Sequence, residues 1–484
     1  MKNRLPRKDC CGTITTIKDK SVGFARRKEK TMYQKNVWEN MTPEKKKAMF
    51  DFNEGYKAFL SAAKTERLAV KQAEALARKA GYKCFCEMKS LKAGDKVYFI
   101  NREKNIVLYH IGKKPLTDGM KVLGAHIDSP RLDLKQNPLY ESKGFALMDT
   151  HYYGGIKKYQ YVTIPLAFHG VICKTDGEKV YVSIGEKDDE PVMGIGDLLP
   201  HLAQEQMKGT AATFIEGEKL DVTVGSIPLE GEEKDAVKAN VLKILKDKYG
   251  VTEEDLVSAE IEVVPAGKAR DYGLDASMVM SYGQDDRVCA YTSLMALLDV
   301  EDPEYTACCE LVDKEEIGSV GATGAQSVFF ENTVAELLNL AGETSYIALK
   351  RCMENSKMLS SDVSAGLDPL YASVSEENNC AKLNYGVVFN KYTGSRGKGG
   401  SNDAQPEFMA YLRGILDRDG VYFQTGELGK VDAGGGGTIA YIMAKYNMLV
   451  IDAGVPVLNM HAPWEVTAKA DVYEAYLCYK SFIK

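Results

Sequence analysis

The sequence lacks any long apolar run. None approaches the roughly 18 residues that a membrane-spanning helix requires, and the basic residues 1–8 are not followed by the apolar stretch of a secretory signal. Cysteine is also scarce: the eleven cysteines are an odd number spread through 484 residues, unlike a disulfide framework. Cys84 and Cys86 are only a weak metal signal, because free cysteines usually behave as small buried apolar residues. The sequence therefore predicts a cytoplasmic globular protein with reduced thiols and no membrane partner.

An excess of charge of one sign is missing too. The chain has 62 basic and 68 acidic residues, a formal net charge of −6, which gives no general case for nucleic-acid binding. Basic residues cluster near the start, where residues 1–31 show no periodicity, so we expect a flexible basic extension there. A nucleic-acid-binding arm is the alternative for this stretch.

Length and apolar patterning predict an α/β protein with an insertion. A chain of 484 residues is too long for one core of ordinary size. Apolar stripes with helical spacing alternate with short strands on both sides of residues 135–265, which contain mostly β-like runs. We therefore expect a mainly parallel sheet with helices on both faces, built from residues 32–134 and 266–484. A β-rich domain at residues 135–265 would interrupt it.

Individual elements can be placed from capping and alternation. Thr42 before Pro43, and Thr65, are expected to begin two helices, and residues 97–100 and 106–109 alternate like a hairpin. Further strands are expected at residues 121–126, 162–166, 180–184, 220–224, 306–312, 448–452 and 455–459, and further helices near residues 235–248, 321–338 and 472–482. Ligands of such sheets bind beyond the carboxyl ends of the strands, and the segments that follow residues 126 and 312 meet this condition.

Five short segments carry an ordered set of histidines and carboxylates. They are residues 124–130, 283–287, 313–319, 360–364 and 460–465, which contain His126, Asp285, Glu315, Glu316, Asp362 and His461. This order supplies two imidazoles, one carboxylate that can bridge, one carboxylate for each of two metals, and a spare glutamate as base. Each segment alone has a plain structural explanation, such as a helix cap or a solvated acidic loop. Together and in this order they favour a two-metal hydrolase.

Local spacing explains how two of these segments would work. His126 and Asp128 share one face of an extended segment, so Asp128 can accept a hydrogen bond from the imidazole nitrogen that does not bind metal. Glu315 and Glu316 follow a strand, and the glycines after them predict a tight loop. A turn there would direct one carboxylate to a metal and the other to a water molecule.

The chain resembles the aspartyl aminopeptidases, a metallopeptidase family with a co-catalytic zinc pair, and is most similar to their bacterial, clostridial-type branch. The resemblance runs from about residue 38 to the C-terminus. Besides the five segments above, residues 152–155, 264–270, 391–396 and 429–432 carry it.

The resemblance implies roles for individual residues. Asp285 would bridge two zinc ions per subunit, Glu315 would be the general base, and Asp128 would orient His126. The terminal zinc ligands would come from His126, Glu316, Asp362 and His461. It also implies a cis peptide bond between Asp285 and Asp286, a β-rich dimerisation domain inserted in the catalytic domain, and a homo-oligomer of twelve subunits. Cobalt or manganese could substitute for zinc.

Two features bear on specificity and on a further ligand. Residues 157–161, Lys-Lys-Tyr-Gln-Tyr, replace the Trp and Asp-Arg of eukaryotic-type members, which weakens the inference of an acidic substrate. Arg396 and Lys398, in a glycine-containing loop, are the best local cations for an acidic first residue, and a solvated surface loop is the alternative. His201 is a further candidate metal ligand, with a helix-start or subunit-contact role as the alternative.

These observations predict a metal-dependent aminopeptidase that removes N-terminal residues, preferably Asp or Glu, from peptides. Two metal ions would lower the pKa of a shared water towards ~7, Glu315 would take its proton, and one ion would bind the free amine of the substrate. The alternatives are a di-zinc aminopeptidase of neutral specificity and a non-catalytic assembly protein that keeps the fold.

Overall fold

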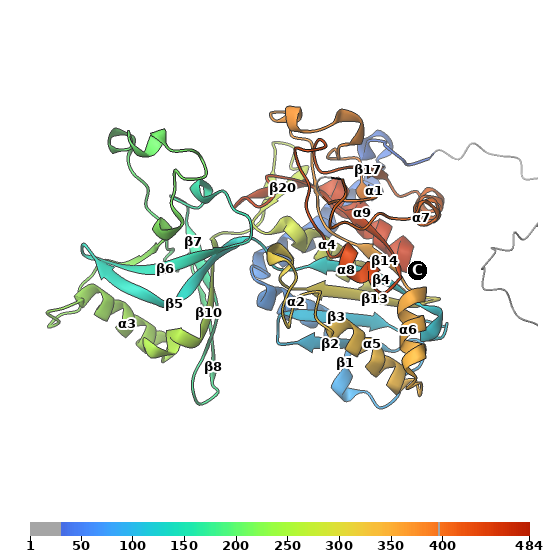
Figure 1. Ribbon diagram of the computed structural model, residues 1–484, viewed down its shortest axis with the longest axis horizontal. Coiled ribbons are helices and arrows are strands. Elements are labelled where there is room, and N and C mark those ends of the chain that lie inside the picture. The colour runs from blue at the N-terminus through green and yellow to red at the C-terminus, as the bar shows by residue number, and fades with distance from the viewer. Residues whose placement is uncertain (1–30, 395–396) are drawn as a thin grey trace, which may run out of the picture. The chain divides into compact units, whose positions relative to one another are not determined.

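Three sheets organise the described chain, residues 31–394 and 397–484, in this computed structural model. The largest has nine strands in the order β1-β2-β3-β13-β4-β14-β18-β16-β17 (Figure 1). Its four central strands, β13 to β18 in that order, are parallel, and antiparallel pairs flank them. The strands are β1 (Lys83–Cys84), β2 (Lys96–Asn101), β3 (Asn105–His110), β4 (Met120–His126), β13 (Thr306–Val312), β14 (Lys357–Ser360), β16 (Val387–Asn390), β17 (Phe423–Thr425) and β18 (Leu449–Gly454). The expected α/β class is confirmed, with a mixed sheet.

Helices pack on both faces of this sheet because successive side chains of its strands point to opposite faces, and both faces are apolar. On β4, Leu123 and Ala125 join one apolar core, whereas Met120 and Val122 join the other. The first core is covered by α1 (Pro43–Ala62), α2 (Glu66–Lys79), α4 (Gln284–Leu298), α7 (Pro406–Asp419) and α9 (Lys469–Ile483). The second is covered by α5 (Phe329–Leu340), α6 (Tyr346–Asn355) and α8 (Ala440–Ala444).

The predicted helix caps and hairpin are present. Thr42 accepts a hydrogen bond from the backbone N–H of Lys45 at 3.2 Å and so begins α1. Thr65 begins α2 in the same way. In the β2–β3 hairpin, Val97 lies opposite Tyr109.

A second sheet of six strands is formed entirely within residues 131–265. Its order is β8-β7-β10-β5-β6-β9, and α3 (Ala236–Tyr249) packs against it over a separate apolar core (Figure 1). The strands are β5 (Arg131–Ser142), β6 (Phe145–Tyr153), β7 (Leu166–Cys173), β8 (Lys179–Ile184), β9 (Val222–Gly225) and β10 (Ala259–Pro265). The division of the chain at residues 135 and 265 stays a prediction, which this sheet supports.

A third sheet has five strands. One of them directly precedes α4 in the sequence, and the turn that contains His461 connects two others. Its order is β11-β12-β20-β19-β15. The strands are β11 (Arg270–Tyr272), β12 (Met278–Ser281), β15 (Ser364–Ala365), β19 (Pro456–Leu458) and β20 (Glu465–Ala468).

Two predicted elements are wrong. The helix expected at residues 321–338 begins only at Phe329, because Gly321 has a φ of +106° and the chain turns back until the N–H of Gln326 reaches the carbonyl of Ser319 at 3.1 Å. The strand expected at residues 162–166 is absent apart from Leu166. Thr163 there has a φ of 61°, outside the β region.

Three other expectations concern membranes, thiols and the N-terminus. Within the described part of the chain, no helix combines the length and apolarity needed to cross a bilayer. The nine cysteines described by the structure are all free thiols. The expected basic extension, residues 1–31, lies outside the described residues except for Thr31.

Candidate metal centre

Three neighbouring parallel strands deliver four of the six predicted site residues to one edge of the nine-stranded sheet. His126 is the last residue of β4. Its neighbour β13 leads through Lys314 into a short 3₁₀ turn, η9 (Glu315–Ile317), and β14 is followed by Asp362. Carboxyl ends of parallel strands meet at one edge, as the sequence predicted for a ligand site.

The remaining two residues come from segments outside the nine-stranded sheet. Asp285 lies at the start of α4, after β12, and His461 lies in the turn between β19 and β20. The peptide bond between Asp285 and Asp286 is cis, as predicted.

Asp285 lies between the two imidazoles. Its Oδ1 is 3.2 Å from Nε2 of His126, and its Oδ2 is 3.3 Å from Nε2 of His461. Glu316 approaches His461, with 3.4 Å between Oε2 and Nε2. Around His126 Nε2, Asp362 Oδ1 lies at 3.9 Å and Glu315 Oε2 at 4.0 Å. The structure therefore brings all six predicted residues of the cluster together.

The charges of the cluster are strongly perturbed. Burial raises the pKa of Glu316 and of Asp362 above the ordinary carboxyl range, and it raises the pKa of Glu315 to about 7. Burial alone would lower the pKa of His461, but the Asp285 and Glu316 carboxylates outweigh it and raise the pKa to about 10. The imidazoles thus sit in a negative field, which favours cations.

The donor set fits a pair of metal ions. Imidazole nitrogens and carboxylate oxygens are the ligands that zinc takes in catalytic sites. Oδ1 of Asp285 and Oε1 of Glu316 are buried without a hydrogen-bond partner among the described residues, and such oxygens are costly unless they bind a donor or a cation. His126, Asp285 and Glu316 hold ligand atoms within 4.8 Å of one another, and so do His126, Asp286 and Asp362.

Asp128 does more than the sequence predicted. It is fully buried, and its Oδ1 lies 3.3 Å from Nδ1 of His126, as expected for an orienting group. The same carboxylate also accepts hydrogen bonds from the backbone N–H groups of Glu315 and Glu316, each at 3.2 Å. These bonds fix the turn that separates the two glutamates. Burial alone would raise the pKa of Asp128, but the contacts with His126 and Tyr153 outweigh it and lower the pKa.

Sequence reasoning missed two residues that support the cluster. Glu465 is buried and accepts hydrogen bonds from the backbone N–H of His461 at 2.8 Å and of Asp285 at 3.0 Å. Tyr153 donates its hydroxyl to Oδ2 of Asp128 at 2.8 Å. Both belong to segments that the sequence singled out. The contact of Glu465 with Asp285 and that of Tyr153 with Asp128 join residues 180 and 25 positions apart, so spacing gave no signal.

A cavity of about 410 Å³ opens onto the cluster. It is lined by the site residues, by the backbone of Gly435, Gly436 and Gly437, and by polar side chains that include Asn390, Thr393 and Thr438. Among the described residues, neither Lys nor Arg lines this cavity.

The other predicted site residues are not in the cluster. His201 lies on the 3₁₀ helix η5 (Pro200–Leu202), is exposed, and belongs to none of the possible metal-ligand groups of the described residues. Lys398 lines a neighbouring cavity, where its Nζ pairs with Asp403 at 3.1 Å and lies 3.8 Å from the ring centroid of Tyr392. Arg396 lies outside the described residues.

The chain matches a protein-family model and close relatives over nearly its whole length. Residues 59–483 match the model described as aminopeptidase I zinc metalloprotease (M18). A probable M18 family aminopeptidase 1 from Clostridium acetobutylicum is 57% identical over 454 residues, which cover 93% of this chain and 98% of the relative.

Solved structures agree with this match. An M18-family aminopeptidase from Thermotoga maritima is 45% identical with a TM-score of 0.90, covering 93% of this chain and 99% of that one. Aminopeptidase I from C. acetobutylicum is 55% identical with a TM-score of 0.87 over 93% and 99% of the two chains. The S. cerevisiae mApe1 dodecamer is 20% identical, with a TM-score of 0.72 over 89% and 95%, and shows a likeness of fold alone.

Proposed function

Because the chain belongs to the M18 family of aminopeptidase I zinc metalloproteases, we propose that it removes N-terminal residues from peptides at a pair of zinc ions. The position of Asp285 between the imidazoles of His126 and His461 carries this proposal, since one carboxylate oxygen faces each imidazole. Asp362 would complete the ligands on the side of His126, and Glu316 those on the side of His461. Cobalt or manganese would be substitutes.

The bound ions would polarise the scissile carbonyl and lower the pKa of the attacking water. Glu315 accepts the proton of that water and returns it to the leaving amine. Its pKa of about 7, raised by burial, suits a group that must take up and release a proton near neutral pH. The N–H of Glu315, held by Asp128 at 3.2 Å, keeps the base in place.

The metal pair proposed beside Asp285, Glu316 and Asp362 favours an exopeptidase. One of the ions would bind the free amine of a peptide, whereas an acetylated terminus offers no amine lone pair to a metal. The cavity of about 410 Å³ holds one residue close to these carboxylates more readily than a continuous chain.

The test compares matched peptides on the purified chain after zinc loading. Peptides with a free N-terminus should lose their first residue, whereas the same peptides with an acetylated N-terminus should not react. Cleavage of the acetylated peptide would contradict the exopeptidase proposal. Full zinc occupancy without any turnover would favour the alternative of a non-catalytic assembly protein.

An acidic first residue remains our proposal for specificity, and it rests on the loop at residues 391–398. Lys398 is the described cation of this loop that lies in the neighbouring cavity. One observation favours the alternative, a preference for neutral first residues. No Lys or Arg among the described residues lines the cavity at the cluster, and a substrate carboxylate buried there without a cation would be costly. Rates on Asp-, Glu- and Leu-terminated peptides separate the two.

We also propose that the chain forms a large homo-oligomer, of twelve subunits as in the yeast mApe1 dodecamer. Residues 135–265 would provide subunit contacts, since apolar side chains are exposed there. They are Val192, Leu198, Leu199, Leu202, Met207 and Ile227. His201 lies among them, so a subunit contact is its better-supported role. Light scattering that gives a monomer at micromolar concentration would contradict this proposal. A cytoplasmic location, consistent with the free thiols, stays a prediction.

A further inference from the structure

The chain that leaves β6, residues 153–155, contacts the supports of both imidazoles in the metal centre. Tyr153 donates its hydroxyl to Oδ2 of Asp128 at 2.8 Å, and Asp128 faces Nδ1 of His126. Two residues later, the carbonyl of Gly155 lies 2.9 Å from Nδ1 of His461. We propose that this segment, the 153–155 arm, sets the orientation and tautomer of both imidazoles and thereby makes the six-stranded sheet part of the metal centre. The inference rests on the proposed function.

The tautomers are fixed because Nδ1 of each imidazole faces only acceptors. A backbone carbonyl cannot donate a proton, so Nδ1 of His461 must be the donor to Gly155. Its Nε2 is then free for a cation and points to Asp285 and Glu316, at 3.3 and 3.4 Å. Asp128 imposes the same tautomer on His126, because its backbone carbonyl lies 3.0 Å and its carboxylate 3.3 Å from Nδ1.

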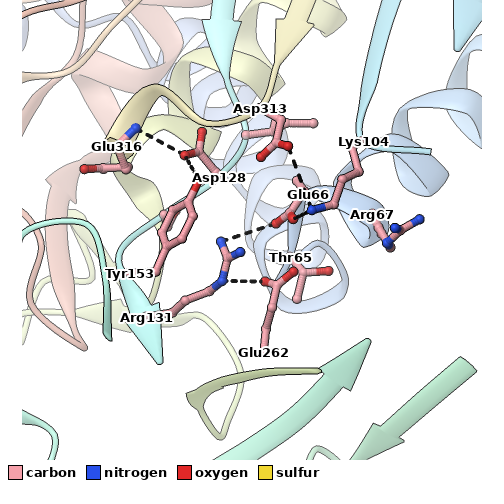
Figure 2. A network of polar contacts seen from close by, with 12 residues as sticks. Thr65, Glu66, Arg67, Lys104, Asp128, Arg131, Tyr153, Glu262, Asp313 and Glu316 are labelled. Atoms are coloured by element: carbon pink, nitrogen blue, oxygen red, sulfur yellow. Dashed lines mark hydrogen bonds and ion pairs between the residues drawn. The ribbon is translucent and has the colours of Figure 1, made fainter. Parts of the chain in front are cut away.

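Among the side chains that contact the Asp128 carboxylate, Tyr153 makes the shorter contact. Each oxygen of the Asp128 carboxylate accepts one backbone N–H of the η9 turn at 3.2 Å, and Oδ1 lies 3.3 Å from His126. The Tyr153 hydroxyl is closer, at 2.8 Å, and it is the partner that holds Oδ2 from the side of the six-stranded sheet (Figure 2). Without it, a fully buried carboxylate would lose a charge-assisted hydrogen bond and could rotate.

Arg131 holds the Tyr153 ring in turn. The guanidinium carbon lies 3.9 Å from the ring centroid, and Arg131 is only 3% exposed. It forms ion pairs with Glu66 of α2 at 3.4 Å and with Glu262 of β10 at 3.1 Å (Figure 2). A third ion pair joins it to Asp133 at 2.8 Å. A cation held by three carboxylates and stacked on a ring has little freedom to move, so the Tyr153 hydroxyl stays aimed at Asp128.

Gly154 lets the arm reach His461. Its φ is +71°, in the left-handed region that favours glycine. A Cβ at this position would lie 3.3 Å from Cβ of Glu316, so the backbone passes directly beside a proposed ligand. The arm therefore turns between its two contacts without room for a side chain.

The test removes one oxygen atom and measures metal binding rather than turnover. Tyr153→Phe keeps the ring on Arg131 but removes the donor to Asp128. We expect the zinc dissociation constant of the metal-free protein, measured by competition with a chromophoric chelator, to rise by about 10–100-fold. The visible spectrum of the cobalt-substituted variant should also change, because the ligand field at His126 changes. Excess zinc should restore much of the turnover.

Tyr140→Phe is the matched control, because Tyr140 lies on the same sheet and donates to the carboxylate of Asp221 at 2.5 Å. It should bind zinc as the unmodified chain does. Gly154→Ala is a second variant that should weaken zinc binding by displacing the arm. If Tyr153→Phe binds zinc and cobalt with unchanged affinity and spectrum, the arm only packs and the inference is overturned. If the unmodified chain binds two zinc ions but cleaves no peptide, the proposed function fails. The zinc affinity and cobalt spectrum of Tyr153→Phe would still test the role of the arm.

Discussion

Oε2 of Glu465 accepts a hydrogen bond of 3.0 Å from the backbone N–H of Asp285, the residue that lies between the two imidazoles. The other oxygen of Glu465 accepts the backbone N–H of His461 at 2.8 Å. One buried carboxylate therefore ties the start of α4 to the turn between β19 and β20. Asp285 and Glu465 are 180 positions apart in the sequence. The side-chain amide of Gln284 adds a second link between the segments, to the carbonyl of Glu465 at 2.6 Å.

We expect Glu465→Gln to weaken zinc binding by about 10–100-fold. A glutamine offers one acceptor and one amide NH₂, so in either orientation its NH₂ must face a backbone N–H of Asp285 or His461. The zinc dissociation constant measures the effect, with Glu407→Gln, an exposed position on α7, as the control. Unchanged affinity in Glu465→Gln would show that the two segments keep their places without the carboxylate.

Glu315→Gln should retain both metals and lose turnover by about 10²–10⁴-fold. The amide keeps the shape of the side chain but cannot accept a proton near neutral pH. Metal analysis and kcat on a free peptide are measured together, with the exposed Glu354→Gln as the control. Near-normal kcat would remove Glu315 from the reaction, and loss of metal would make it a ligand instead of a base.

Asp285→Ala should lose at least one of the two metals even at high added zinc. Each oxygen of Asp285 faces a different imidazole, at 3.2 and 3.3 Å, and no other carboxylate of the described residues is placed this close to both. Elemental analysis of the variant checks this, with the exposed Asp302→Ala as the control. Two tightly held zinc ions in Asp285→Ala would exclude a bridging role.

The cluster could be predicted from the sequence because its chemistry is carried by whole motifs. His126 and Asp128 belong to one extended segment, and Glu315 and Glu316 are adjacent, so residue type and spacing indicated a ligand with its orienting group and a ligand paired with a base. The family resemblance then assigned the role of each residue. Glu465 and Tyr153 act through hydrogen bonds to residues 180 and 25 positions away. Spacing carries no information about such contacts, and only the fold brings them together.

The same distinction explains the fold. The β2–β3 hairpin and the helices begun by Thr42 and Thr65 depend on local capping and alternation, and they form as predicted. The region after Glu316 has helix-compatible residues, but Gly321 and the contact of Gln326 with Ser319 fold it into a loop. The left-handed backbone of Gly321 and this hydrogen bond outweigh the weak helix propensity of the segment.

Arg396→Ala and Lys398→Ala test the proposed acidic preference. If the loop at residues 391–398 binds the substrate carboxylate, either change should lower the ratio of Asp to Leu cleavage, because Leu-terminated peptides do not need the cation. The ratio of kcat/KM values measures this independently of general effects on folding. Lys382→Ala is a control, as a lysine that lines neither the cluster cavity nor the neighbouring cavity that Lys398 lines. An unchanged ratio in both variants would favour neutral specificity.

Glu310, on β13, is a buried carboxyl group that takes no part in the proposed chemistry. It is 2% exposed, its Oε2 has no partner among the described residues, and its strand neighbours are Gly124 and Val107. Burial raises its pKa to about 8, from an ordinary value near 4.5. Between these two values the folded chain keeps a proton that the unfolded chain releases, so the free energy of unfolding must fall as the pH rises.

Glu310→Gln removes this dependence, because an amide stays neutral at every pH tested. From about pH 6 to about pH 9, the unmodified chain should lose about 2–3 kcal/mol of unfolding free energy relative to the variant. Urea unfolding of both chains at equal concentration across this range measures the difference, and Glu230→Gln, at an exposed position, should show none. Parallel pH profiles for Glu310→Gln and the unmodified chain would mean that Glu310 ionises at its ordinary pKa, through a partner or water molecule that stabilises its charge inside the fold.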